Sequence, residues 1–411
     1  MTADDLRRMA PGGETAPPDG LPDTGPQRPR LQYVDNLRIA LTALVVLHHV
    51  GVTYGNIPAW YYTEPAKDGS GAALDLFVMF NQAFFMGFFF MIAGYFTPPS
   101  YARKGARFYY RDRLKRLGIP LLVFLLLIRP LVTLHVFEGL RDEVPYWAFY
   151  LLSWDAGPMW FVEVLLVFAA AYVLVRRRAE PRTERRAHAA EAGRVAGPQG
   201  GRGPRWSSDP RPLRPGAVII FTAALALATY LWRFLVPTGT YVPFLGLPTP
   251  NFLPQYASFF VIGVLAFRRG WPQTLSRAAG RTGFAVAAGA TLVHLVATAT
   301  SPDGASLGHG TWQSLAAAAW ESTFAVSMVI GLTVFFREHL NRQGRTAAFL
   351  SRHAFAVYLI HPAVLVGVSF AFRRLDAPAA VKFTLVAALA LPLCWVVAYA
   401  VRSLPRADRV L

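Results

Sequence analysis

Long apolar stretches separated by short polar segments make up most of the chain from about residue 36 onward. Each stretch is close to the roughly 20 residues that a helix needs to cross a bilayer. The pattern predicts ten membrane helices, at 36–56, 74–97, 117–137, 158–176, 215–233, 251–268, 281–300, 314–336, 349–372 and 379–402. The predicted fold class is therefore all-α, a polytopic membrane helix bundle of about ten transmembrane helices.

Two segments depart from this pattern because they are poor in apolar residues and rich in Pro, Gly, Arg and Ala. Such segments cannot bury enough apolar surface to fold. We predict a disordered cytoplasmic N-terminal segment at 1–32 and a ten-helix membrane domain at 33–404. A disordered, arginine-rich cytoplasmic loop at 177–212 interrupts this domain. We expect membrane lipid to be a partner of the loop, because arginines bind anionic headgroups.

Basic residues alternate between the predicted loops. Arginine is abundant in 98–116, 176–214 and 268–281 and nearly absent from 57–73, 139–157, 234–250 and 301–313. Because loops rich in Lys and Arg stay in the cytoplasm, we expect the basic loops and both termini on that side. Arg373 and Arg374 are the exception, since they fall on the predicted outer side.

Composition agrees with a membrane protein. The chain is 54% hydrophobic and 16% charged, whereas soluble proteins carry about 25% charged residues. The net charge of +17 raises the question of nucleic acid. We expect no nucleic-acid partner, because the basic residues lie in short loops where membrane topology explains them. Cys394 is the single cysteine and excludes a disulfide within one chain.

The first predicted helix carries two ionisable groups, Arg38 and His49, eleven residues apart. At about 100° per residue they return to nearly the same helical face, about 16 Å apart along the axis. Ionisable groups inside a membrane are costly and commonly mark functional sites. The alternative is a snorkelling arginine and a histidine that packs with its neighbour His48.

Counting about 1.5 Å per residue from the predicted helix ends places several titratable groups near the level of His49. They are His361, Arg129 and His294. Glu163 and Glu321 come out closer to the outer surface. Groups at such depths should face the bundle interior and one another.

Imidazole suits proton abstraction because its pKa is near the operating pH. We take His49, His361 and Glu163 as candidate catalytic residues. His361 also has a structural interpretation, as the polar neighbour of a kink at Pro362. His294 is interpreted as a packed polar residue.

The segment 109–120 is strongly basic and precedes the third predicted helix. Its arginines either set topology or bind a phosphorylated cofactor through forked, charge-assisted hydrogen bonds. Candidate cofactor-binding residues are Arg38, Arg113, Arg116 and Arg129. No metal is expected, because adjacent His48 and His49 point about 100° apart and no cysteine or carboxylate cluster completes a ligand set.

Sequence motifs occur in order along 33–372: Arg38-x10-His49, the aromatic run from Phe88 to Phe96, Arg113-x-x-Arg116 before Pro120, and the segments Met159-Trp160-Phe161-Val162 and Tyr358-Leu359-Ile360-His361-Pro362. Together they resemble those of the acyltransferase family 3 membrane proteins. The resemblance is strongest to the branch of periplasmic glucan succinyltransferases.

This resemblance implies a cell-envelope enzyme of the bacterial plasma membrane that takes acetyl-CoA or succinyl-CoA as donor on the cytoplasmic side. The acceptor would be a hydroxyl of a glycan or of another glycosylated molecule. Arg38, Arg113 and Arg116 would hold donor phosphates, and His49 would activate the acceptor or carry the acyl group. The resulting prediction is an integral membrane O-acyltransferase. The alternative is a non-enzymatic carrier or flippase for an amphipathic or anionic molecule.

Overall fold

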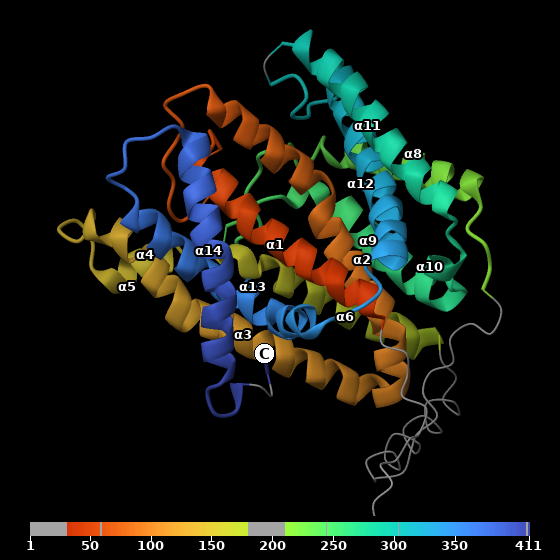
Figure 1. Ribbon diagram of the computed structural model, residues 1–411, viewed down its shortest axis with the longest axis horizontal. Coiled ribbons are helices and arrows are strands. Elements are labelled where there is room, and N and C mark those ends of the chain that lie inside the picture. Colours follow the sequence, from red (N-terminus) through yellow and green to blue (C-terminus); the bar gives the residue numbers. More distant parts are fainter. Residues whose placement is uncertain (1–30, 58–59, 180–209, 244, 303, 408–409) are drawn as a thin grey trace, which may run out of the picture. The chain divides into compact units, whose positions relative to one another are not determined.

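The computed structural model describes residues 31–57, 60–179, 210–243, 245–302, 304–407 and 410–411 (Figure 1). The two segments predicted to be disordered, 1–32 and 177–212, lie outside the described residues apart from their edges. Two of those edges are helical, because one helix already begins at Gln32 and the helix that begins at Trp160 continues to Ala179.

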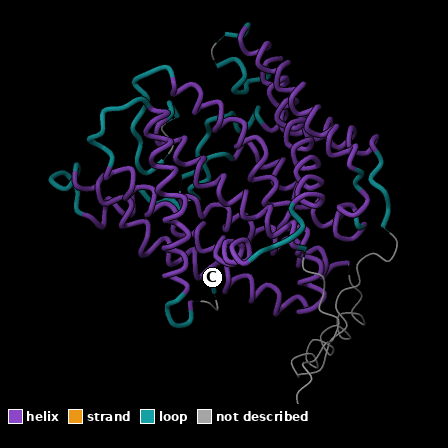
Figure 2. Tube along the Cα trace, in the orientation of Figure 1, coloured by secondary structure: helices purple, strands orange, loops and turns teal. Residues whose placement is uncertain are grey.

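Regular structure in the described ranges is helical throughout, apart from one isolated antiparallel bridge between Val242 and Leu247 (Figure 2). The longer helices are α1 (Gln32–Tyr54), α2 (Ser70–Arg113), α4 (Arg129–Glu138), α6 (Trp160–Ala179), α8 (Pro215–Trp232), α9 (Leu253–Arg269), α11 (Arg277–Ala299), α12 (Trp312–His339), α13 (Arg345–Ala371) and α14 (Ala379–Arg402). The shorter elements are η2 (Leu114–Gly118), α3 (Ile119–Val123), η3 (Phe124–Ile128), α5 (Tyr146–Leu152), η4 (Gly157–Met159), η5 (Pro250–Phe252) and α10 (Trp271–Thr274).

Nine helical segments of the described chain are long and apolar enough to cross a membrane. One of them, Ser70–Glu138, has 69 residues. At about 1.5 Å per residue it would extend about 100 Å, several times the thickness of a hydrocarbon core. It contains both the second and the third predicted spans, so the predicted polytopic all-α bundle of about ten helices is confirmed.

The basic segment 98–116 was predicted as a loop, but it is helical in the structure. Helix α2 continues through Pro98 and Pro99 to Arg113, and its one non-helical residue is Gly105, with φ 70° and ψ 166°. Helix-favouring Ala, Arg and Lys surround this glycine. The chain therefore bends at one residue that tolerates positive φ and otherwise stays helical.

Close packing of α2 on α9 depends on two small residues. A Cβ added to Gly94 would collide with the backbone oxygen of Phe260, and one added to Gly263 would collide with that of Met91. Small residues let helix backbones approach closely inside membranes. The aromatic segment that ends at Phe96 thus contains a residue with a clear packing role, Gly94.

Loops predicted to share one side of the membrane meet at one end of the bundle. The connecting hydrogen bonds join Tyr61 to Asp155, Asp68 to Ala379, and Thr238 to Leu307. The loop that carries Arg373 and Arg374 belongs to this end, because it leads directly into Ala379. The start of α1 lies at the opposite end, where Asn36 binds the turn between α12 and α13.

Candidate functional site

Two of the candidate catalytic residues meet between α1 and α13. The ring centroids of His49 and His361 are 5.1 Å apart. His361 is fully buried and His49 partly so. His49 lies five residues before the end of α1, and His361 ten residues before the end of α13. The two imidazoles therefore share one level of the bundle, as the sequence predicted.

An indole ring covers this imidazole pair. The Trp60 ring centroid lies 3.8 Å from that of His49 and 6.0 Å from that of His361. Trp60 belongs to the loop after α1, which folds back because the backbone amide of Glu64 bonds the carbonyl of Thr53 at 2.7 Å. Sequence reasoning missed Trp60, since the path of a loop leaves no periodic signal. The aromatic run Trp60-Tyr61-Tyr62 in a loop was the only hint.

The hydrogen bonds of both rings determine which nitrogen is basic. Nδ1 of His49 lies 2.9 Å from the carbonyl oxygen of Val45, and Nδ1 of His361 lies 2.7 Å from that of Tyr358. A carbonyl oxygen only accepts, so in each case Nδ1 carries the proton and the neutral ring has its lone pair on Nε2. Nε2 of His361 is buried and has no hydrogen-bond partner among the described residues. Two neighbouring imidazoles thus offer basic nitrogens.

His48 takes a different direction. Its ring stacks on Phe85 with centroids 5.0 Å apart and meets the His49 ring edge-on, at 85° between planes. This divergence is what a step of about 100° along one helix produces. His48 is therefore a packing residue beside the imidazole pair.

Glu163 lies in the first turn of α6. Its Oε2 atom is buried and has no hydrogen-bond partner in the described part of the chain. Two residues earlier in the same turn, the Phe161 ring centroid lies 6.0 Å from that of Tyr358, which is three residues before His361. The Tyr358 hydroxyl donates to the backbone oxygen of Pro158, which ties α13 to the start of α6. Glu163 is thus placed beside α13, close to the turn that carries His361.

Arg129 is fully buried within a network of protein groups. Its guanidinium donates to the backbone oxygen and hydroxyl of Ser153 and stacks on Tyr150, 4.8 Å from the ring centroid. It also lies 3.9 Å from the Asp155 carboxylate. The sequence suggested a cofactor contact for Arg129, whereas the observed contacts are internal and hold the loop after α5 against the membrane domain.

Asp155 extends this network to the loop that carries Trp60. Its carboxylate accepts a hydrogen bond from the Tyr61 hydroxyl at 3.0 Å and another from the backbone amide of Gly157 at 2.7 Å. Burial raises the pKa of Tyr61 well above its ordinary value, and the negative charge of Asp155 adds to the rise. The phenol therefore stays protonated and donates. Tyr61 holds its neighbour Trp60 over the imidazoles through this bond.

The other candidate arginines lie on helices that lead to the opposite end. Arg38 is in the second turn of α1, and Arg113 and Arg116 follow at the far end of α2 from Ser70. Each contacts its own segment: Arg38 pairs with Asp35 at 3.8 Å, Arg113 lies 5.4 Å from the Tyr109 ring centroid, and Arg116 bonds Asp112 at 3.3 Å. These surface contacts leave the guanidinium groups accessible, because the side chains are partly or largely exposed.

A second group of buried polar residues lies among α8, α11 and α12, where α12 packs on both of the other helices (Figure 1). The Arg233 guanidinium, just after α8, bonds the Glu321 carboxylate of α12 at 2.5 Å. Nearby, His294 of α11 stacks flat on Trp320, with centroids 4.3 Å apart and 5° between planes. The packing interpretation of His294 is thereby supported, and the Arg233–Glu321 pair was not predicted.

Known proteins resemble the chain in sequence. The acyltransferase 3 family model, described as an acyltransferase domain, matches residues 31–399. Glucans biosynthesis protein C of Salmonella typhi is 25% identical over 258 residues, which are 58% of this chain and 59% of that protein. The protein of the same name from Escherichia coli K12 is 28% identical over 156 residues, 36% of this chain and 40% of the relative. The chain thus spans about three fifths of the first relative's length. No solved structure matches the chain.

Proposed function

The chain belongs to the acyltransferase 3 family, and we propose that it moves an acyl group from cytoplasmic acyl-CoA to a hydroxyl of a glycan or other glycosylated acceptor. That it is an acyltransferase, and an integral membrane one, follows from the family and from its membrane-length helices. The observation that carries the finer proposal is the pair of adjacent imidazoles, His49 and His361, beneath Trp60.

In the direct form of the proposed reaction, the acceptor oxygen attacks the thioester carbonyl carbon while its proton passes to an imidazole Nε2. The carbon–sulfur bond breaks, and the CoA thiolate leaves and takes up the proton. A positioned base of this kind contributes about 10²–10⁴ in rate. Trp60, whose ring centroid lies 3.8 Å from that of His49, would shield this carbonyl carbon from water and so limit hydrolysis.

The paired rings also suit a route through an acyl-enzyme. Nε2 of His49 would attack the thioester carbonyl carbon and the carbon–sulfur bond would break, leaving a CoA thiolate and an acylimidazolium that keeps its Nδ1 proton. The acceptor oxygen would then attack the acyl carbon, its proton would pass to Nε2 of His361, and His49 would leave as the neutral imidazole. His361 would finally release that proton, which balances the proton taken up by the thiolate. The second ring is close enough for this role, since the centroids are 5.1 Å apart. His49 is the base or the acyl carrier in these two routes.

Donor binding is proposed at the other end of the bundle. Arg38 lies about 16 Å from His49 along α1. Arg38, Arg113 and Arg116 present exposed or partly exposed guanidinium groups, which suit phosphates of acetyl-CoA or succinyl-CoA. Glucans biosynthesis protein C, the relative named above, supports a glycan as acceptor.

This arrangement includes a proposal for sidedness. We place the end with Arg38 and both termini in the cytoplasm, and the Trp60 loop outside a bacterial plasma membrane. In a Cys394→Ser background, impermeant thiol reagents should label Lys67→Cys in intact cells and Arg342→Cys only after lysis. Both positions are exposed, and Cys394 itself is buried. Labelling of Arg342→Cys in intact cells would show that the orientation is the reverse of the proposed one.

The activity itself is tested with purified protein in lipid nanodiscs. CoA thiol release is measured with acetyl-CoA or succinyl-CoA, with and without a glucose oligosaccharide, and the sugar is analysed by mass spectrometry. Acceptor-dependent thiol release with an equal amount of acylated sugar is expected. The carrier would be favoured instead by two results together. Neither thiol release nor acylated sugar would appear with any pair of donor and acceptor, and the sugar or acyl-CoA would move across a sealed bilayer.

A further inference from the structure

An apolar groove of about 720 Å³ lies between α8 and α11. Both helices pack on α12, but within the described chain they do not pack closely on each other (Figure 1). α12 therefore forms the floor of the groove, and α8 and α11 form its walls. Small residues of all three helices leave the space open, namely Ala223, Ala226, Ala279, Gly283 and Ala319.

The two helices that form the walls lie at the periphery of the bundle. Of the nine membrane-length segments in the described chain, α8 and α11 are the least buried. Only 17% of the apolar stretch of each is buried, against 50% for α12. The core of a bilayer contains no water, and an apolar space does not hold any. The groove is therefore filled by hydrocarbon rather than by water.

The lining offers carbon surface rather than hydrogen-bonding groups. Two of its hydroxyl groups are already used by the protein. Thr222 donates to the carbonyl oxygen of Val218 at 2.9 Å, and the Ser276 hydroxyl accepts from the backbone amide of Ala279 at 3.1 Å. An aliphatic chain needs no hydrogen-bond partner, so it fits this lining better than a sugar or a nucleotide does.

The length of the groove equals the depth of one leaflet. Its lining runs over 215–226 on α8, 276–286 on α11 and 319–330 on α12. At about 1.5 Å per residue each range extends about 15–17 Å, and half of a hydrocarbon core is about 15 Å thick. Next to the groove, Trp320 joins α12 to α11 by donating to the Thr291 hydroxyl at 3.1 Å. One acyl chain therefore matches the groove, whereas a helix of a second copy would cross the whole core.

Basic residues stand at the end of the groove where α8 and α11 begin. Arg214 and Arg281 each directly precede a lining residue, and both side chains are exposed. Arg277 is exposed as well, although it pairs with Glu338 at 2.6 Å. The partial positive charge of the two helix N-termini adds to the attraction for an anion. This end of the groove therefore suits a negatively charged headgroup.

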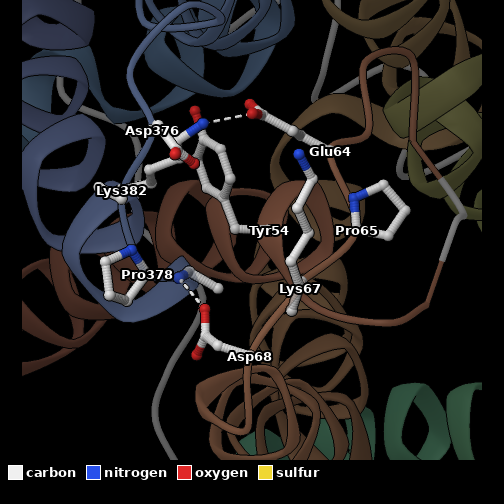
Figure 3. A pocket seen from close by; sticks show the side chains of 11 residues that line it. Tyr54, Glu64, Pro65, Lys67, Asp68, Asp376, Pro378 and Lys382 are labelled. Carbon is white, nitrogen blue, oxygen red and sulfur yellow. Dashed lines mark hydrogen bonds and ion pairs between the residues drawn. The ribbon is translucent and has the colours of Figure 1, made fainter.

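A smaller cavity of about 280 Å³ at the other end of the bundle has the opposite character (Figure 3). Its walls carry charged side chains that are met by groups of the protein. The Lys382 ammonium pairs with the Glu64 carboxylate, and the Asp68 carboxylate accepts from the backbone amide of Ala379. The groove between α8 and α11, with its exposed walls, is the better candidate for a ligand.

We propose that this groove binds an acyl chain of an anionic phospholipid, with the phosphate near Arg214 and Arg281. The site goes beyond the proposed transfer and does not depend on it. Lipid tails are as apolar as the lining, so the chain supplies the fit and the headgroup supplies the selectivity. The headgroup lies at the end of the bundle where α1 begins, since the turn after α12 binds Asn36. In the orientation proposed above, this is the cytoplasmic leaflet, which carries anionic lipids.

The headgroup is tested on delipidated protein in detergent. Native mass spectrometry follows titrations with dioleoyl phosphatidylglycerol and dioleoyl phosphatidylcholine, which share their chains and differ in net charge. One phosphatidylglycerol should bind more tightly than phosphatidylcholine. Arg214→Gln with Arg281→Gln should weaken its binding about 25-fold, about fivefold for each arginine. Arg342→Gln with Arg345→Gln is the control, because both arginines are exposed at the same end and lie outside the lining.

The acyl chain is tested with two neighbouring alanines of α8. Ala223 is exposed and lines the groove, so Ala223→Trp places an indole in the space of the chain without entering the core. It should weaken phosphatidylglycerol binding about tenfold or more. Ala224→Trp is the matched control, because Ala224 is also exposed, lies outside the lining and points about 100° away. Its affinity should be that of the unsubstituted protein.

The outcomes do not depend on acyl transfer. Selective binding that is weakened in both groove variants and kept in both controls supports the site. Equal affinity of the unsubstituted protein for the two lipids, or a groove variant that matches its control, overturns it. The same spectra report the oligomeric state. A change of that state in Ala223→Trp with unchanged phosphatidylglycerol binding would assign the groove to a second copy and also overturn the proposal.

Discussion

Two of the regions in which the described chain buries polar side chains differ in how those side chains are partnered. Among α8, α11 and α12, the Arg233 cation meets the Glu321 anion at 2.5 Å, so each charge has its partner. Between α1 and α13, two neutral imidazoles face each other, and Nε2 of His361 has no partner within the described residues. Buried charges must be paired to persist, whereas a neutral imidazole can be buried at lower cost and keep a reactive lone pair.

His294 shows which property separates the two regions. Like His361 it is buried and has a ring nitrogen without a partner in the described chain. Its ring, however, stacks flat on the indole of Trp320, which is not titratable. His361 faces the second imidazole of His49 instead. The proximity of a second imidazole, rather than burial or an orphaned atom alone, is the feature on which the proposed role of His49 and His361 rests.

Removing one ring of the imidazole pair should have the largest effect on activity. His49→Ala is expected to lower transfer by about 10²–10⁴, because it deletes the base or acyl carrier. Expression and thermal unfolding should stay near those of the unsubstituted protein, since His49 is only partly buried. The measurement is CoA release per folded molecule in nanodiscs.

His48→Ala is the matched control for that experiment. It removes an adjacent imidazole of the same helix, but one that stacks on Phe85 and points away from His361. Its loss of activity should be much smaller. Equal losses in the two variants, or full activity in His49→Ala, would exclude His49 from the reaction and leave His361 as the preferred base.

The Arg233–Glu321 pair should show the opposite behaviour, a loss of stability without a loss of chemistry. Arg233→Met leaves a buried carboxylate unpaired and should lower the free energy of unfolding by about 3–5 kcal/mol. Adding Glu321→Leu removes the unpaired carboxylate and should restore much of the lost free energy of unfolding. Thermal unfolding in nanodiscs measures both variants. Activity per folded molecule should be nearly unchanged, and a loss as large as that of His49→Ala would assign this pair to the reaction.

Arg113→Gln and Arg116→Gln test donor binding at the end away from Trp60. A charge-assisted phosphate contact is worth about 1.5–3 kcal/mol, so each variant should weaken acyl-CoA binding about ten- to hundredfold. Isothermal titration with the donor alone is the measurement. Arg107→Gln, an exposed arginine of the same basic segment, is the control. Donor affinity equal to that of the control in both variants would leave Arg113 and Arg116 with a topological role only.

Helix periodicity and rise account for what the sequence predicted well. The lengths of the apolar stretches predicted the membrane helices. Counting residues along the helices placed His49 and His361 at one level, and their rings meet there. Both inferences use distances within a straight helix, which the sequence determines. The bend at Gly105 was missed because the basic segment 98–116 was interpreted as a loop, whereas it is helical on both sides of this residue.

Contacts made through loops were beyond such counting. Trp60 reaches His49 because its loop folds back, and Arg129 finds Asp155 in a turn 26 residues further along the chain. Neither of these two loop contacts leaves a periodic pattern in the sequence. The sequence therefore identified Arg129 as a buried cation without identifying its partners within the protein.

Tyr61→Phe should have the smallest effect. It deletes one hydrogen bond to Asp155, which keeps its bond from the Gly157 amide, so the free energy of unfolding should fall by about 0.5–1.5 kcal/mol. Transfer should fall less than tenfold, because Trp60 still stacks on His49. Since the pKa of Tyr61 is raised, the folded state favours the neutral phenol. Its contribution is complete below the ordinary tyrosine pKa of about 10 and is lost only as the pH rises past that value through the raised one. The difference in unfolding temperature between the two proteins should therefore be constant from about pH 6 to pH 9. A difference that changes with pH in this window would mean that another titrating group, rather than the Tyr61 hydroxyl, holds the loop in place.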